Sequence, residues 1–197
     1  MLFNRYKKKV LSKYITGCNV AKAIQQHNKL NATIKLAIPD IDNYDLKKRW
    51  INLSSESFFY GNAYSIAAAA HECGHAIQHK NHYWPLKTYW RMLPIARDLS
   101  VLPFILLALG VFNSAFLFAG GVTYLLLMLF FLLFLPIEFN ASSLAIKNLR
   151  ELDLVTKQDM PVIKEVLFIA SLLYFVRFLA APVLYPVIAL QKATKSK

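Results

Sequence analysis

The chain has 197 residues and a formal net charge of +12, and it is 56% hydrophobic but only 17% charged. Soluble domains have about 45–50% apolar and about 25% charged residues, so this composition disfavours an ordinary soluble domain and indicates a membrane protein. A basic chain suits either nucleic acid or an anionic membrane surface. No Lys or Arg lies between Ser100 and Ile146, so the basic residues flank an apolar stretch, and no aromatic-basic RNA-binding motif accompanies them. We therefore expect a lipid bilayer as a partner and no nucleic acid.

Residues 1–99 are predicted to form a basic part with a small β-hairpin and one long helix. A first helix is expected at about 18–28. Alternating apolar and polar residues at 31–37 indicate a strand, turn residues follow at 39–45, and 50–53 has the pattern of a second short strand. The two strands are expected to form a hairpin, or a sheet of two or three strands. No apolar region follows the basic start, so no secretory signal peptide is evident and internal segments are expected to enter the membrane.

The long helix is predicted over residues 63–80. This segment is rich in alanine, the residue with the highest helix propensity, and it contains no proline. Gly61-Asn62 marks the point where it begins. Cys73 lies inside it and is interpreted as a small, reduced, packing residue, because Cys18 and Cys73 fit neither a disulfide framework nor a paired-thiolate zinc spacing.

Residues 101–137 contain no formally charged residue. One membrane span needs about 20 residues, so a stretch of this length fits two. We expect a transmembrane helical hairpin over 100–137, with helices at about 101–117 and 121–137 and a very short turn near Gly120-Gly121. The alternative is a buried helix pair of a soluble protein.

Residues 138–197 are expected to hold a third-ligand segment and a third, C-terminal membrane helix. The apolar stretch at 162–190 is long enough to span, but it carries Arg177 and the prolines Pro182 and Pro186. A kinked or partly interfacial helix is therefore the alternative to a full span. The expected fold class is a mainly α-helical membrane protein, with residues 1–197 in a single domain.

The segment His71-Glu72-Cys73-Gly74-His75 has the H-E-x-x-H spacing of zinc-binding helices. Residues i and i+4 lie on one helix face about a turn apart, so two imidazoles can bind one tetrahedral zinc ion. The Glu that follows the first His then lies near the same metal and can act as a general base toward water. We expect His71 and His75 as zinc ligands and Glu72 as the catalytic base. The alternative is a solvated helix with two incidental histidines.

A third protein ligand is needed, and Glu138 is the strongest candidate. His79 continues the i+4 spacing, but it lies about 12 Å along a helix from His71, too far for one ion with zinc–nitrogen bonds of about 2.1 Å. Glu138 follows the apolar hairpin at once. Two spans return the chain to the face that it left, so Glu138 and His75 are expected at the same membrane boundary. The alternative is an ordinary interfacial carboxylate that caps the next helix.

These segments resemble the bacterial membrane-bound neutral zinc metallopeptidases called YugP-like. The similarity runs from about Thr16 to about Leu190 and includes TGCNVAKAI, INLSSESFF, SIAAAAHECGHAIQH, YWPLK and LPIEFNAS. The resemblance implies one zinc ion, with His71 and His75 as ligands and Glu72 as catalyst.

The segment from Glu138 to Ser142 is also similar to the third-ligand segment of CAAX prenyl protease and HtpX-type membrane peptidases. In those enzymes a polar residue four positions after the ligand Glu supports the site, which implies this role for Ser142, with Asn140 nearby.

Two departures from the family pattern stand out. Family members usually begin with an additional transmembrane helix, where this chain has a basic, polar segment. They also often carry Asp-His-Tyr-Asp-Pro between the strands, where this chain has Asp42-Asn43-Tyr44-Asp45-Leu46.

The expected function is that of a gluzincin-like zinc metalloendopeptidase, embedded in the membrane, which hydrolyses peptide bonds at the membrane interface. Its substrate would be a polypeptide, including membrane proteins, and the strand at 50–53 would either pair with an extended substrate or serve as plain sheet core. The alternative is a catalytically silent membrane protein or adaptor, whose structural zinc site would be closed by four protein ligands. The flanking basic residues predict a multi-pass cell-membrane protein with its active site on the cytoplasmic side.

Overall fold

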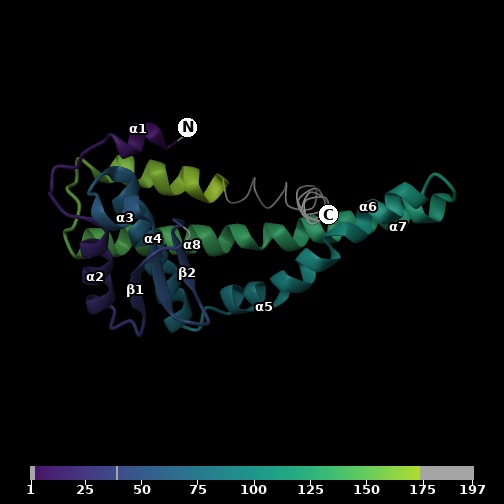
Figure 1. Ribbon diagram of the computed structural model, residues 1–197, viewed down its shortest axis with the longest axis horizontal. Coiled ribbons are helices and arrows are strands. Elements are labelled where there is room, and N and C mark those ends of the chain that lie inside the picture. The colour runs from purple at the N-terminus through teal and green to yellow at the C-terminus, as the bar shows by residue number, and fades with distance from the viewer. Residues whose placement is uncertain (1–2, 39, 174–197) are drawn as a thin grey trace, which may run out of the picture. The chain divides into compact units, whose positions relative to one another are not determined.

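The computed structural model describes residues 3–38 and 40–173, which are mainly helical and include one small sheet (Figure 1). They divide into two compact units. Among the described residues, the first combines the chain up to Trp84 with Ile137–Ser171, and the second contains Pro85–Pro136.

The first unit contains most of the secondary structure. In chain order it holds α1 (Asn4–Lys7), α2 (Gly17–His27), β1 (Thr33–Leu36), β2 (Asn43–Asp45), β3 (Trp50–Leu53), α3 (Ser55–Phe59), α4 (Ala63–Lys80) and the larger part of α8 (Phe134–Glu151). Residues 160–173 are also helical. The helices predicted at 18–28 and 63–80 are confirmed as α2 and α4.

Side-chain caps explain where these two helices begin. The Thr16 hydroxyl accepts a hydrogen bond from the Asn19 backbone N–H at 3.3 Å, and the Asn62 side-chain oxygen accepts one from the Ser65 N–H at 2.9 Å. Such caps satisfy N–H groups that have no partner inside the helix. Gly61-Asn62 therefore marks the start of α4, as the sequence indicates.

The expected alternative of a three-stranded sheet is confirmed, but the two predicted strands do not form a hairpin with each other. The sheet has the order β1-β3-β2, with β1 parallel to β3 and β2 antiparallel to it. The hairpin is formed by β2 and β3, and β2 lies in the segment interpreted as a turn. The prediction missed β2 because its three residues are mostly polar, while its strand geometry depends on Tyr44 pairing with Ile51. Since β3 pairs on both sides, it is sheet core and not a strand with an edge for substrate.

Helix α4 forms the centre of the first unit. α2, α3 and β3 pack against it (Figure 1). Its buried residues include Ile66, Ala67, Ala70 and Cys73. The Cys73 thiol donates to the Ala21 carbonyl at 3.8 Å, in agreement with its interpretation as a packing residue. The alanines let neighbouring elements approach closely, so the His-containing helix is held on several sides.

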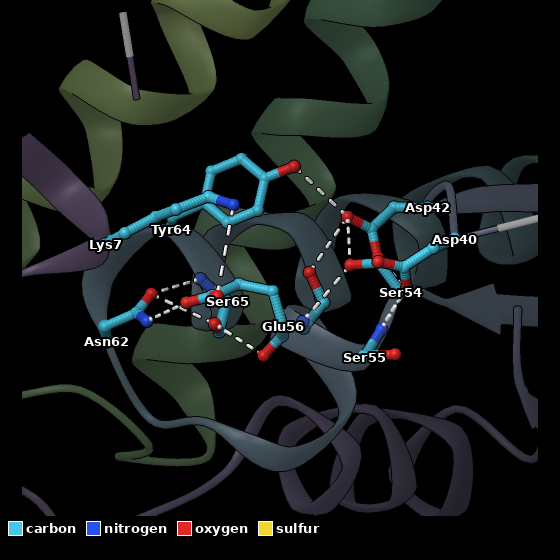
Figure 2. A network of polar contacts seen from close by, with 10 residues as sticks. Lys7, Asp40, Asp42, Ser54, Ser55, Glu56, Asn62, Tyr64 and Ser65 are labelled. Carbon is cyan, nitrogen blue, oxygen red and sulfur yellow. Dashed lines mark hydrogen bonds and ion pairs between the residues drawn. The ribbon is translucent and has the colours of Figure 1, made fainter. Parts of the chain in front are cut away.

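A buried carboxylate connects the sheet to the first turn of α4. Asp42 accepts hydrogen bonds from the Ser54 N–H at 2.7 Å, the Ser57 hydroxyl at 2.9 Å and the Tyr64 hydroxyl at 3.2 Å (Figure 2). Ser54 and Ser57 lie at the start of α3, and Tyr64 lies in α4. One side chain therefore fixes three elements relative to one another.

The second unit consists mainly of helices. It contains most of α5 (Trp84–Asp98), a short 3-10 turn (Leu99–Val101), α6 (Leu102–Leu109) and α7 (Ser114–Leu132). The predicted hairpin turn near Gly120-Gly121 is wrong, because the chain turns at residues 110–113 and Asn113 caps α7. Gly120 is instead a packing residue, since a Cβ there would lie 2.9 Å from the backbone nitrogen of Leu107 in α6.

One helix of the described chain, Ser114–Glu151, is long and apolar enough to cross a membrane. A second span is counted if the bent pair Trp84–Ala96 and Leu99–Leu109, with 62° between its halves, crosses as one. α6 alone has eight residues and extends only about 12 Å. The expected C-terminal membrane helix is described only up to residue 173, and Arg177, Pro182 and Pro186 lie outside the described residues.

Candidate metal centre

Three side chains of the first unit converge on one point. The His71 Nε2 atom lies 3.0 Å from Glu138 Oε2 and 3.2 Å from His75 Nε2, and His75 Nε2 lies 3.3 Å from Glu138 Oε1. His71 and His75 come from one face of α4, and Glu138 comes from α8. Within residues 3–38 and 40–173, these are the three groups whose ligand atoms lie close enough to share a metal ion, all within 4.8 Å of one another.

The other nitrogen of each imidazole already has a partner. His71 Nδ1 lies 3.1 Å from the Ser142 hydroxyl, which in turn contacts the Ser171 hydroxyl at 3.2 Å. His75 Nδ1 lies 3.0 Å from the side-chain oxygen of Gln78. Such bonds fix the ring orientation and direct the remaining nitrogen to a metal. Both Nε2 atoms therefore face Glu138.

Gln78 is a supporting residue that the sequence analysis missed. Its amide nitrogen donates to the Ile137 carbonyl at 2.8 Å and to the Asn140 side-chain oxygen at 2.9 Å. Gln78 thereby links His75 to the backbone directly before Glu138. Its position three residues after His75, on the same helix face, is the sequence signal that identifies it.

Close approach of α8 to α4 depends on Gly74. A Cβ at this position would lie 2.3 Å from the Ala141 carbonyl oxygen, so only glycine leaves room for the α8 backbone. Gly74 lies between the two histidines in sequence, and Ala141 lies one helical turn from Glu138. This glycine therefore sets the spacing at which the carboxylate meets the imidazoles.

Glu72 is almost completely buried beside this cluster. Burial raises the pKa of its carboxyl to about 7, against the opposing effect of His71 and His75. A carboxyl in this range can accept and return a proton near neutral pH, as a general base requires.

The other described histidines do not join the cluster. His79 Nδ1 lies 2.8 Å from the Tyr44 hydroxyl, and the His27 ring lies 3.9 Å from Glu151 at the surface. The position of His79 one turn beyond His75 agrees with the helix geometry that excluded it as a ligand of the same ion as His71.

The donor set fits a zinc ion. Two imidazole nitrogens and one carboxylate are the ligands of many catalytic zinc sites, which keep a fourth position open for water or substrate. All three groups are buried or half-buried, a hydrogen-bond partner orients each imidazole, and the carboxylate favours a cation. The cluster could therefore bind one metal ion with an open position.

Comparison with known proteins agrees with this chemistry. The model of a family described as "Putative neutral zinc metallopeptidase" matches residues 1–190. The chain is 31% identical over 180 residues to the "Putative membrane protease YugP" of Bacillus subtilis (strain 168), an alignment that covers 87% of this chain and 78% of that protein. No solved structure matches the chain significantly. The resemblance found from the sequence motifs is confirmed, and the chain belongs to the neutral zinc metallopeptidase family.

Proposed function

We propose that this protein is a zinc-dependent endopeptidase that hydrolyses polypeptides at the surface of the cell membrane. The observation that carries the proposal is the convergence of His71 Nε2, His75 Nε2 and a Glu138 carboxylate oxygen within 4.8 Å. Membership of a zinc metallopeptidase family supports the same chemistry.

His71, His75 and Glu138 would hold one zinc ion. When bound, zinc supplies Lewis acidity that polarises a peptide carbonyl and makes a water molecule more acidic. Ser142 and Gln78 keep the two imidazoles in the orientation that this binding needs, because each contacts the Nδ1 atom of one ring.

Glu72 is the proposed general base. It directly follows His71 in α4, and its carboxylate would take a proton from the water that attacks the scissile carbonyl and deliver a proton to the leaving amine. Its burial keeps bulk water from competing for this proton. This role distinguishes a catalytic site from a structural one, which needs ligands but no base.

The membrane location is supported by the helix that carries Glu138. This residue lies within Ser114–Glu151, the described helix that is long and apolar enough to cross a bilayer. The matched Bacillus protein is named a membrane protease. With the bent pair Trp84–Ala96 and Leu99–Leu109 crossing as a second span, both flanks of the apolar stretch lie on one face. We place the site at the cytoplasmic boundary on this basis, because both flanks are basic and such residues are retained in the cytoplasm.

A catalytically silent protein with a structural zinc ion is the competing function. A structural zinc site is closed by four protein ligands, whereas the described residues supply a group of three. The three-ligand set and the adjacent buried Glu72 favour catalysis.

The test compares the purified full-length protein in detergent with its Glu72→Gln variant. Metal analysis should find one zinc per chain in both, while peptide hydrolysis should fall at least about 100-fold in the variant because the base is lost. Glu138→Ala should lower zinc affinity, since it removes one of three ligands. Full hydrolytic activity in Glu72→Gln would contradict the mechanism, and zinc with no hydrolysis in either protein would favour the silent alternative.

A further inference from the structure

A pocket lined by several basic side chains lies in the first unit, at the C-terminal end of α4. It has a volume of about 290 Å³, and we call it the basic pocket. Its polar lining comes mainly from Lys29, Tyr44, Arg49, His79, Lys80 and His82. No Asp or Glu is among its lining residues. Asp45 directly follows the lining residue Tyr44 in β2, and its carboxylate accepts hydrogen bonds from the N–H groups of Lys47 and Lys48.

Three of these residues occupy a backbone conformation that normally favours glycine. Lys29, Arg49 and His82 have φ angles of 48°, 55° and 52°. Only one other non-glycine residue in the described part of the chain, Asp153, has a positive φ. Lys29 and His82 each follow a helix C-cap, where a left-handed residue is the ordinary helix end and glycine adopts it most easily. The pocket thus concentrates cationic side chains at positions where glycine would fit more easily.

The C-terminal ends of two helices offset only part of the positive charge in the basic pocket. α2 and α4 both end at the pocket, with Leu30 N–H bonded to the Gln25 carbonyl at 3.0 Å and Tyr83 N–H to the Gln78 carbonyl at 2.9 Å. Cations are favourable at helix C-termini, so a purely structural role is the competing explanation.

The sizes of the charges argue against that explanation. Two helix ends carry about −0.5 charge each. Lys29, Arg49 and Lys80 bring three full positive charges, of which Lys80 donates to the Asn28 carbonyl at 2.6 Å. The carboxylate of Asp45, next to Tyr44 in β2, offsets one more of these charges. An excess of roughly one positive charge remains, so the pocket suits an anionic group.

The position of the pocket relates that anion to the proposed catalytic site. Ala76, which lines the pocket, directly follows His75, and His79 lies one turn further along the same helix, about 6 Å along its axis. An extended peptide advances about 3.3 Å per residue. The metal centre lies between His71 and His75, so its offset from His79 along the helix axis averages about 9 Å. A peptide bond at the metal centre and a side chain in the pocket would therefore be about two to three residues apart along this axis.

We propose that the basic pocket is a specificity subsite that binds an acidic side chain of the polypeptide substrate, two or three residues from the scissile bond. The proposal rests on the proposed peptidase function. An anionic lipid headgroup has matching charge, but the pocket shares its wall with the helix that carries the proposed ligands, which favours the substrate.

The test measures binding separately from hydrolysis. Fluorescent peptides with one Glu at successive positions, and matched peptides with Gln, are titrated against the full-length Glu72→Gln protein in detergent. Binding should favour the Glu peptide about tenfold or more at one position, because a charged carboxylate bonds to two or more cations. The same preference should appear as a lower KM in the wild-type hydrolysis assay, with kcat little changed.

The pocket variant combines Lys29→Gly with Arg49→Gly. Glycine accepts the positive φ at both positions, so this variant should fold at least as well as the parent while losing two positive charges. The preference for Glu over Gln should disappear in it. The control combines Lys22→Gln with Lys157→Gln, two exposed lysines outside the pocket, and should keep the preference.

Several results would overturn the subsite. One is equal binding of Glu and Gln peptides to the parent protein. The others are a preference for Glu that survives in the pocket variant, or a control variant that loses this preference as fully as the pocket variant does. If micelles with an anionic phospholipid bind the parent but not the pocket variant, while peptide preference is unchanged, the pocket binds a lipid headgroup instead. Charge-selective peptide binding without hydrolysis by the wild type would support the subsite and contradict the peptidase function.

Discussion

Gly74 offers the sharpest test of how the site is built, because it lies where α4 and α8 touch. A Cβ added at Gly74 would lie 2.3 Å from the Ala141 carbonyl oxygen, 2.9 Å from its carbon and 3.1 Å from the Ala141 Cα. All three atoms are backbone, so no side-chain rotation can relieve the contact. In Gly74→Ala, α8 must therefore withdraw by roughly 1 Å or more to restore an ordinary separation of about 3.4 Å.

That displacement is large compared with what a zinc site tolerates. Metal–ligand distances vary by only about 0.2 Å, and α8 carries the proposed ligand Glu138. We expect zinc affinity to fall by about 10- to 100-fold or more, as when supporting residues of a metal site are changed. Overpacking should also destabilise the fold by about 1–3 kcal/mol, reduced by the better helix propensity of alanine, which contributes about 0.5–1 kcal/mol.

The assay is a chelator competition for zinc together with thermal unfolding of the protein in detergent. Gly121→Ala is the matched control, because a Cβ at Gly121 meets no atom within 4 Å, and it should leave both quantities unchanged or slightly raise stability. Wild-type zinc affinity and wild-type unfolding temperature in Gly74→Ala would refute the claim that this glycine sets the distance between Glu138 and the histidines.

Three further substitutions test individual contacts. Ser142→Ala removes the partner of His71 Nδ1 and should weaken zinc binding by about 10- to 100-fold in the same competition assay, while Ser143→Ala, at an exposed neighbour, should not. Asp42→Ala leaves the Ser54 N–H and the Ser57 and Tyr64 hydroxyls without their acceptor. It should therefore lower the free energy of unfolding by about 2–4 kcal/mol. An unchanged free energy of unfolding would show that this carboxylate does not connect the sheet to α4. Gly120→Ala should destabilise the α6–α7 pair by about 1–3 kcal/mol, because its Cβ would lie 2.9 Å from the Leu107 backbone; an unaltered unfolding transition would argue against this close packing.

Local features were predictable because their causes are local. Alanine content and the Asn62 cap define α4 as Ala63–Lys80, and the i, i+4 spacing puts His71 and His75 on one face whatever surrounds the helix. The absence of charge at 101–137 likewise indicates apolar helices without any knowledge of their partners. The turn between α6 and α7 was harder to predict, because Gly120-Gly121 and Asn113 are both residues typical of turns. The choice between them depends on the packing of Gly120 against Leu107, which is a contact between two helices.

Contacts between distant residues were decided by the tertiary structure. The parallel pairing of β1 with β3 and the strand character of Asn43–Asp45 depend on the partner strand and not on the segment itself. The sequence by itself determined helix α4 and the placement of His71 and His75 on one face of it. It also showed that Glu138 directly follows the uncharged stretch 101–137. The tertiary structure decided that Gly74 lets α8 approach, that Gln78 orients His75, and that cations from three separate segments share one pocket. These depend on distances between elements, which a linear pattern does not contain.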